Sequence, residues 1–155
     1  MVSQSSATGA GIVTRPNLTL RRRLNAAPEK VYAAWADPQK LMQWFGPSQV
    51  TAGTVRADVD LRVGGRYRIS FDINDGEHRE VGGVYREVVP GARLVFTWAW
   101  HSTPERESLV TVALKADGGG TLLTLHQEQF LDEAARDGHE AGWISTLDKL
   151  EDYLA

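Results

Sequence analysis

Six segments in which apolar and polar side chains alternate fill most of the chain between Pro47 and Phe130. A two-residue repeat predicts strands that bury one face only, and glycine-rich turns between such segments are typical of hairpins. Pairs such as Gly64 and Gly65 supply the positive φ angles that tight turns require. The chain is therefore expected to form consecutive antiparallel strands in this region. We place these strands near residues 48–57, 66–73, 80–89, 93–101, 107–116 and 120–130.

One more strand and two short helices precede this region. Leu18, Leu20 and Leu24 alternate with polar residues, which predicts a strand that ends shortly before a helix starting near Pro28. Asp37 and the proline after it predict the start of the second helix, because aspartate caps helices and proline fits the first turn.

The C-terminal segment has the pattern of a helix of about 17 residues with one inward face. Asp137 and Glu140 have the spacing of a capping box, which predicts that the helix starts at Asp137. Gly138 and Gly142 each cost ~1 kcal/mol in a helix interior, so we expect backbone or ligand to approach them closely. The inward stripe consists of His139, Trp143, Leu147, Leu150 and Leu154.

Length and composition describe one globular domain. The chain has 155 residues, of which 42% are hydrophobic, and residues 1–16 have the composition of a disordered tail before a single domain at 17–155. Cysteine is absent, which excludes disulfides and thiolate chemistry and favours the cytoplasm. No segment has the pattern of a signal peptide or a membrane span. The net charge of −3 and the acidic second half argue against nucleic acid.

The order of the elements predicts an α+β fold with a cavity. A wide antiparallel sheet twists and curls, and a single long helix across its concave side cannot fill the whole concavity. The remaining volume would be lined by apolar and aromatic side chains, as small-molecule pockets are.

Several short motifs together resemble the family of the activator of heat-shock protein 90 ATPase homologues. The resemblance covers the chain from about residue 17 and implies the START-like (SRPBCC, polyketide cyclase-like) superfamily with its helix-grip fold, a seven-stranded sheet around a long C-terminal helix. It also implies that Gln127 takes the place of a histidine of the family, between His126 and Glu128. The motifs are Ala26–Tyr32, Asp37–Pro38, Trp44–Pro47, Val63–Gly65 with Tyr67, Gly83–Tyr85, Arg93–Trp98 and Gly142–Trp143 with Leu147, Leu150 and Leu154.

The inward faces predict which side chains would contact a ligand. Tyr85, Gln127 and His139 are the polar groups expected to orient it, while one inward arginine among Arg66, Arg68, Arg79 and Arg86 could hold a carboxylate. The complete predicted set is Trp35, Tyr67, Phe71, Tyr85, Phe96, Trp98, Trp100, Gln127, His139, Trp143 and Leu147.

Three functions remain open at this stage. The first is a module that binds a small apolar or lipid-like molecule and needs no cofactor. The second is a partner of a heat-shock ATPase, and the third is a cyclase or hydrolase that uses the same cavity. The four histidines lack metal-ligand spacing and no nucleophile motif occurs, so we assign no metal and no catalytic residue. A homodimer through strand edges, or through Trp44 and Phe45, is a further possibility.

Overall fold

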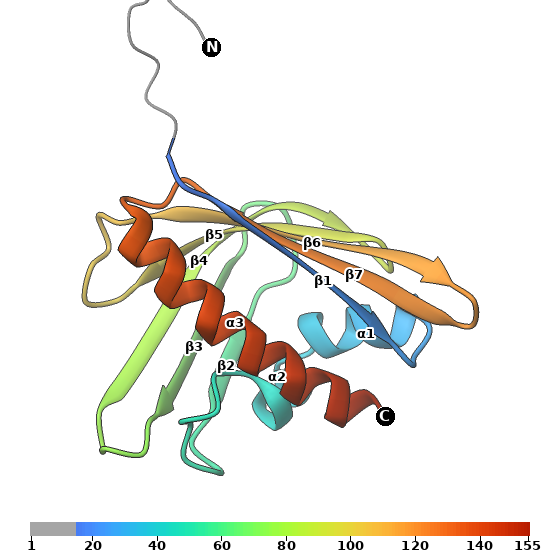
Figure 1. Cartoon of the computed structure of the whole chain (residues 1–155), viewed down its shortest axis with the longest axis horizontal. Helices are drawn as coiled ribbons and strands as arrows, with labels where there is room; N and C mark the ends of the chain where they lie inside the picture. The colour runs from blue at the N-terminus through green and yellow to red at the C-terminus, as the bar shows by residue number, and fades with distance from the viewer. Residues whose placement is uncertain (1–14) are drawn as a thin grey trace, which may run out of the picture.

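A bent antiparallel sheet wraps around the C-terminal helix in the computed structural model, which describes residues 15–155 (Figure 1). In that part of the chain there are seven strands and three helices. Most of the predicted tail, residues 1–14, lies outside the described residues. The elements are β1 Leu18–Leu24, α1 Pro28–Ala36, α2 Pro38–Trp44, β2 Arg56–Val59, β3 Arg66–Asp72, β4 His78–Val89, β5 Arg93–Trp100, β6 Ser108–Asp117, β7 Gly120–Glu128 and α3 Glu133–Leu154.

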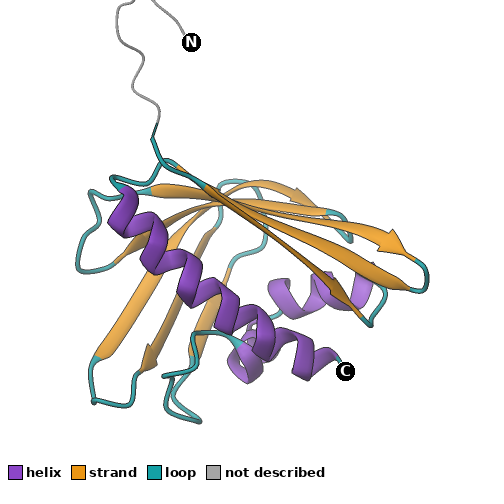
Figure 2. Cartoon of the chain, viewed as in Figure 1, coloured by secondary structure: helices purple, strands orange, loops and turns teal. Residues whose placement is uncertain are grey.

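The strand order is β1-β7-β6-β5-β4-β3-β2, and every neighbouring pair is antiparallel. Consecutive strands from β2 to β7 are neighbours, whereas β1 joins the free edge of β7. All three helices lie on the concave side, with α3 running diagonally across the sheet (Figures 1 and 2). The α+β helix-grip architecture expected from the sequence is confirmed.

Capping aspartates explain where α2 and α3 begin. The Asp37 carboxylate accepts a hydrogen bond from the Gln39 backbone N–H at 2.9 Å, which caps α2. Asp132 caps α3 in the same way, since its carboxylate accepts from the Ala135 backbone N–H at 2.8 Å. The predicted start of the last helix at Asp137 is therefore wrong: α3 begins one turn earlier and has 22 residues.

The first of the six predicted strands is also shorter than expected. β2 covers residues 56–59, whereas the sequence predicted a strand near 48–57. Gly46 and Gly53 adopt positive φ angles of 98° and 80° and turn the chain on both sides of Val50. Val50 itself makes a single bridge to Ile73.

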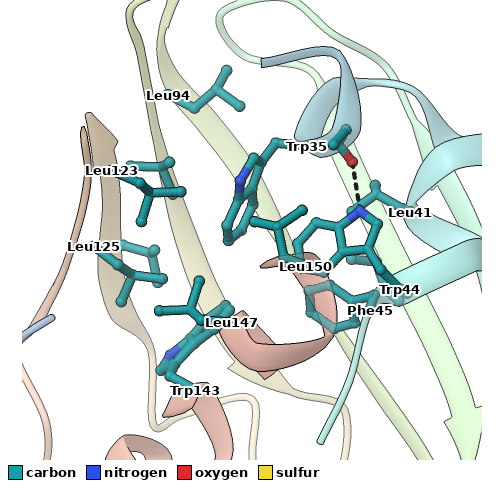
Figure 3. Close-up of a cluster of buried hydrophobic side chains, with 14 of the residues drawn as sticks. Trp35, Leu41, Trp44, Phe45, Leu94, Leu123, Leu125, Trp143, Leu147 and Leu150 are labelled. Atoms are coloured by element: carbon teal, nitrogen blue, oxygen red, sulfur yellow. Dashed lines mark hydrogen bonds between the residues drawn. The ribbon is translucent and has the colours of Figure 1, made fainter. Parts of the chain in front are cut away.

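The main core lies between the C-terminal half of α3, the two short helices and the inner face of the sheet (Figure 3). α1 contacts β6 and β7, while α2 contacts β2 and α3, so the short helices close one end of the concave side. Trp44 donates its indole N–H to the Ala34 carbonyl at 3.0 Å. Trp44 and Phe45 are 1% and 4% exposed, so the prediction that they form a surface for a homodimer is wrong: both are core residues.

Within residues 15–155, no helix is long and apolar enough to cross a membrane. The His, Asp and Glu side chains of the same residues form no group of three that could hold a metal ion.

Two glycine substitutions test the close packing of β4 against β5 and the open space beside α3. A Cβ at Gly83 would overlap the Thr97 carbonyl oxygen on the neighbouring strand, whereas a Cβ at Gly138 would meet no atom within 4 Å. We expect Gly83→Ala to lower the free energy of unfolding by about 1–3 kcal/mol. Gly138→Ala should raise it by up to ~1 kcal/mol, because alanine favours the helix. Chemical denaturation of both variants gives the comparison, and equal effects would contradict the packing described here.

Candidate functional site

An open cavity of about 380 Å³ lies between the N-terminal half of α3 and the inner face of the sheet. Residues of β3, β4 and β5 form its floor, and the loop at 101–107 and the segment after α2 border its mouth. The volume falls within the ~300–1,000 Å³ typical of small-molecule sites. The cavity expected from the sequence is thus present, at the end of the concave side that the short helices leave uncovered.

Small residues on α3 create much of this space. Ala134, Ala135, Gly138 and Gly142 all line the cavity. A Cβ built on either glycine would meet no atom within 4 Å, so neither glycine is there to admit neighbouring backbone. At these two glycines the cavity reaches the α3 backbone, so the expected close approach would have to come from a ligand.

Aromatic side chains from β3, β5, α3 and the segment after α2 form an aromatic wall of the cavity. Trp98 lies at the centre, with its ring centroid 5.1 Å from that of Trp143 and 5.6 Å from that of Trp100. Phe71 packs edge-on against Trp100 at 6.3 Å, and Phe45 reaches Trp98 from the segment after α2 at 6.3 Å. These edge-to-face and tilted contacts give a continuous apolar surface.

Both ring nitrogens of His139 are hydrogen-bonded, and Nε2 joins α3 to the tryptophans of β5. Its Nε2 accepts hydrogen bonds from the indole N–H groups of Trp98 and Trp100, each at 3.2 Å. Its Nδ1 lies 2.8 Å from the Ala135 carbonyl and must donate to it, so the network assigns the neutral tautomer protonated at Nδ1. Burial lowers the pKa of His139, although the hydrogen bond to Ala135 partly opposes this effect.

Gln127 lies beneath the cavity and fixes two of its lining residues. The amide oxygen of Gln127 accepts the Trp143 indole N–H at 2.7 Å, and its amide nitrogen donates to the Ser108 hydroxyl at 2.8 Å. Ser108 in turn donates to the Trp98 carbonyl at 3.3 Å. Gln127 is fully buried and does not line the cavity, so its polar atoms hold the wall in place.

The structure divides the predicted ligand-binding residues into three groups. Five of them line the cavity: Phe71, Trp98, Trp100, His139 and Trp143. Trp35, Tyr67, Tyr85 and Phe96 instead surround a separate void of about 20 Å³ near α1 and α2, which is large enough only for about one water molecule. Gln127 and Leu147 border neither space.

Both tyrosines at this void, Tyr67 and Tyr85, are buried in the core. The Tyr67 hydroxyl donates to the Thr97 carbonyl at 2.6 Å, and burial raises the pKa of both Tyr67 and Tyr85. Neither tyrosine therefore ionises near neutral pH, and Tyr85 does not reach the main cavity, where it was expected to orient a ligand.

Several cavity residues were outside the predicted set. Phe45 and the small α3 residues line the cavity, as do Arg79 and Arg106 at its exposed side. Arg79 is one of the four arginines named above as candidates to hold a carboxylate. It lies two residues before the buried Val81 on the same strand face, which indicates that its side chain points inward. No local signal identifies Arg106, which lies in the irregular loop between β5 and β6.

Replacing Gln127 tests whether this residue has a structural role. Gln127→Met keeps the volume but leaves the Trp143 indole N–H without an acceptor, which should lower the free energy of unfolding by about 1–3 kcal/mol. Gln43→Met, on an exposed face of α2, is the control and should change it by less than ~0.5 kcal/mol. Urea denaturation measures both variants. Unchanged stability of Gln127→Met would show that the amide is not needed to hold the wall.

The stability of the protein should depend on the protonation of His139. Because the pKa of His139 is lowered in the folded state, the unfolded chain takes up the proton first as the pH falls. This contribution to stability is complete above the unfolded pKa of ~6.5 and is lost as the pH falls through the folded pKa. Thermal melts between about pH 7 and 5 should therefore fall more steeply for the wild type than for His139→Gln. Parallel pH profiles would contradict this prediction.

Comparisons with known proteins agree with this architecture. The family model described as Activator of Hsp90 ATPase homolog 1-like protein matches residues 25–155. A solved protein from Chromobacterium violaceum is 30% identical, with a TM-score of 0.77, and the match covers 89% of this chain and 96% of that one. A protein from Silicibacter pomeroyi is also 30% identical, with a TM-score of 0.75 and coverage of 90% and 97%.

A more distant similarity connects the chain to CalU16 from Micromonospora echinospora, which is 25% identical with a TM-score of 0.64 and coverage of 90% and 76%. No curated protein matches the chain. The family model spans the short helices, six of the seven strands and the whole of α3. The chain therefore belongs to the Activator of Hsp90 ATPase homolog 1-like family, within the START-like helix-grip superfamily.

Proposed function

We propose that the protein is a binding module that holds a small apolar or lipid-like molecule between α3 and the sheet. The single observation that carries this proposal is the cavity of about 380 Å³, lined by aromatic side chains and by the small residues of α3. A ligand there would contact Trp98 and Trp100 of β5 on one side. On the other side it would contact Trp143 and the backbone at Gly138 and Gly142, all of α3.

Hydrogen bonds within the wall favour binding to a preformed site. The indole of Trp143 is held by Gln127, and the indoles of Trp98 and Trp100 are held by His139. Side chains that are already ordered lose little entropy when a ligand arrives. Burial of apolar ligand surface at ~25 cal/mol per Å² then supplies the affinity.

The polar groups of the cavity support binding more than catalysis. A general base needs a free lone pair aimed at the substrate, whereas both nitrogens of His139 are already engaged. The lining also contains no aspartate or glutamate. The cyclase or hydrolase alternative therefore has no candidate base among the described lining residues.

Two partners predicted from the sequence stay predictions. A heat-shock ATPase is suggested by the family description alone, and an assay of ATP hydrolysis by that chaperone with and without this protein would test it. A second copy of the chain, docked through the edge strands β1 and β2, would be tested by light scattering.

A fluorescent apolar probe tests the proposed binding function. N-phenyl-1-naphthylamine, a neutral aromatic dye, should bind saturably and receive energy from the cavity tryptophans. Gly142→Leu places a side chain in the cavity and should weaken binding about tenfold, because a loss of roughly 55 Å² of contact costs about 1.4 kcal/mol.

Ala141→Leu is the matched control, because Ala141 is the neighbouring residue on the exposed face of α3 and does not line the cavity. It should bind the dye as the wild type does. Absence of saturable binding, or equal binding by Gly142→Leu, would overturn the proposed function.

A further inference from the structure

Two arginines from separate parts of the chain lie at the exposed side of the cavity. Arg79 is on β4, directly opposite Phe71 of β3, and cross-strand partners point to the same face of a sheet. Because Phe71 faces the cavity, the Arg79 side chain leaves the sheet on the cavity side. Arg106 approaches the same cavity from the loop at 101–107.

The charge of this lining is opposite to that of the whole chain. The chain carries a net charge of −3, yet the cavity is lined by two arginines and by no carboxylate. Arg79 pairs at 3.1 Å with Glu77, which does not line the cavity, and its side chain stays 43% exposed. Among residues 15–155, Arg106 has no salt-bridge partner.

The other three strand arginines that the sequence suggested as carboxylate partners lie away from the cavity. Arg68 and Arg86 do not border the cavity, and Arg68 pairs with Asp58 and Glu80 on its own sheet. Arg66 lines a separate groove along β3 and β4. Of these four strand arginines, only Arg79 lines the cavity.

We propose that the ligand of the cavity is an apolar molecule with one acidic group, whose anion is bound at the mouth by Arg79 and Arg106. This inference rests on the proposed binding function and narrows its ligand class. The apolar part would lie against the aromatic wall, and the anionic oxygens would accept hydrogen bonds from the two guanidinium groups.

The chemistry of the lining supports an anion in two ways. A guanidinium presents its N–H donors as a planar fork that matches the oxygens of a carboxylate or a similar anion. His139 is held neutral by its own hydrogen bonds and supplies no competing charge inside the cavity. The only full charges that border the cavity are therefore the two cations at its exposed side.

Two dyes that differ only in a sulfonate measure the contribution of the anion to binding separately from that of the apolar skeleton. 8-Anilinonaphthalene-1-sulfonate is N-phenyl-1-naphthylamine with an added sulfonate, so any difference between them reports the charged group. We expect Arg79→Met and Arg106→Met each to weaken sulfonate binding by about threefold to fivefold, and the double variant by about tenfold or more. Binding of the neutral dye should change by less than about twofold in all three variants.

Arg86→Met is the matched control, because Arg86 is an exposed arginine on the same strand that does not line the cavity. It should leave the binding of both dyes unchanged. Higher ionic strength should weaken sulfonate binding in the wild type but not in the double variant. Melting temperatures establish that each variant is folded.

The outcomes distinguish the two proposals. Suppose that Gly142→Leu weakens binding of the neutral dye, but the double arginine variant binds the sulfonate dye as the wild type does. The acidic-ligand inference is then overturned, and the proposed binding function stands. If Gly142→Leu binds the sulfonate dye as tightly as the wild type does, the anion binds elsewhere on the surface, and the inference is overturned as well. If neither dye binds saturably, the binding function itself fails.

Discussion

The packing of α3 against the inner face of the sheet depends on how side-chain size changes along one face of that helix. Leu147, Leu150 and Leu154 in the C-terminal half are each at most 3% exposed and complete the core. Gly138 and Gly142 in the N-terminal half leave open space beside the same sheet. One helix therefore stabilises the fold at one end and borders a cavity at the other.

Hydrogen bonds from the indole N–H groups of three cavity tryptophans keep the aromatic wall in one arrangement. Gln127 connects Trp143 to Ser108, and His139 accepts from the indoles of Trp98 and Trp100. A buried donor without an acceptor would cost about 1–3 kcal/mol, so rotating one of these rings away is unfavourable. The shape of the cavity therefore follows from hydrogen bonds behind its surface as well as from the rings themselves.

Sequence patterns predicted most of the fold because strands and helices report their buried faces locally. Phe96, Trp98 and Trp100 were predicted to face inward and do so: Phe96 borders the small void, and the two tryptophans line the cavity. The start of α3 was misplaced because Asp132 and Asp137 are both suitable caps, and the choice depends on where β7 ends. The strand predicted near residues 48–57 failed because turns around Gly46 and Gly53 take up most of that length.

Which side chains face inward, and which family the chain resembles, could be predicted from residue patterns, since alternation and short motifs are local properties. Which of the inward residues reach the cavity depends on how distant elements pack. Tyr67 and Phe96 face inward as Phe71 and Trp98 do, but α1 and α2 close their end of the concave side. That Arg79 and Arg106 border the same cavity is likewise a tertiary property, because no periodicity relates a strand position to an irregular loop.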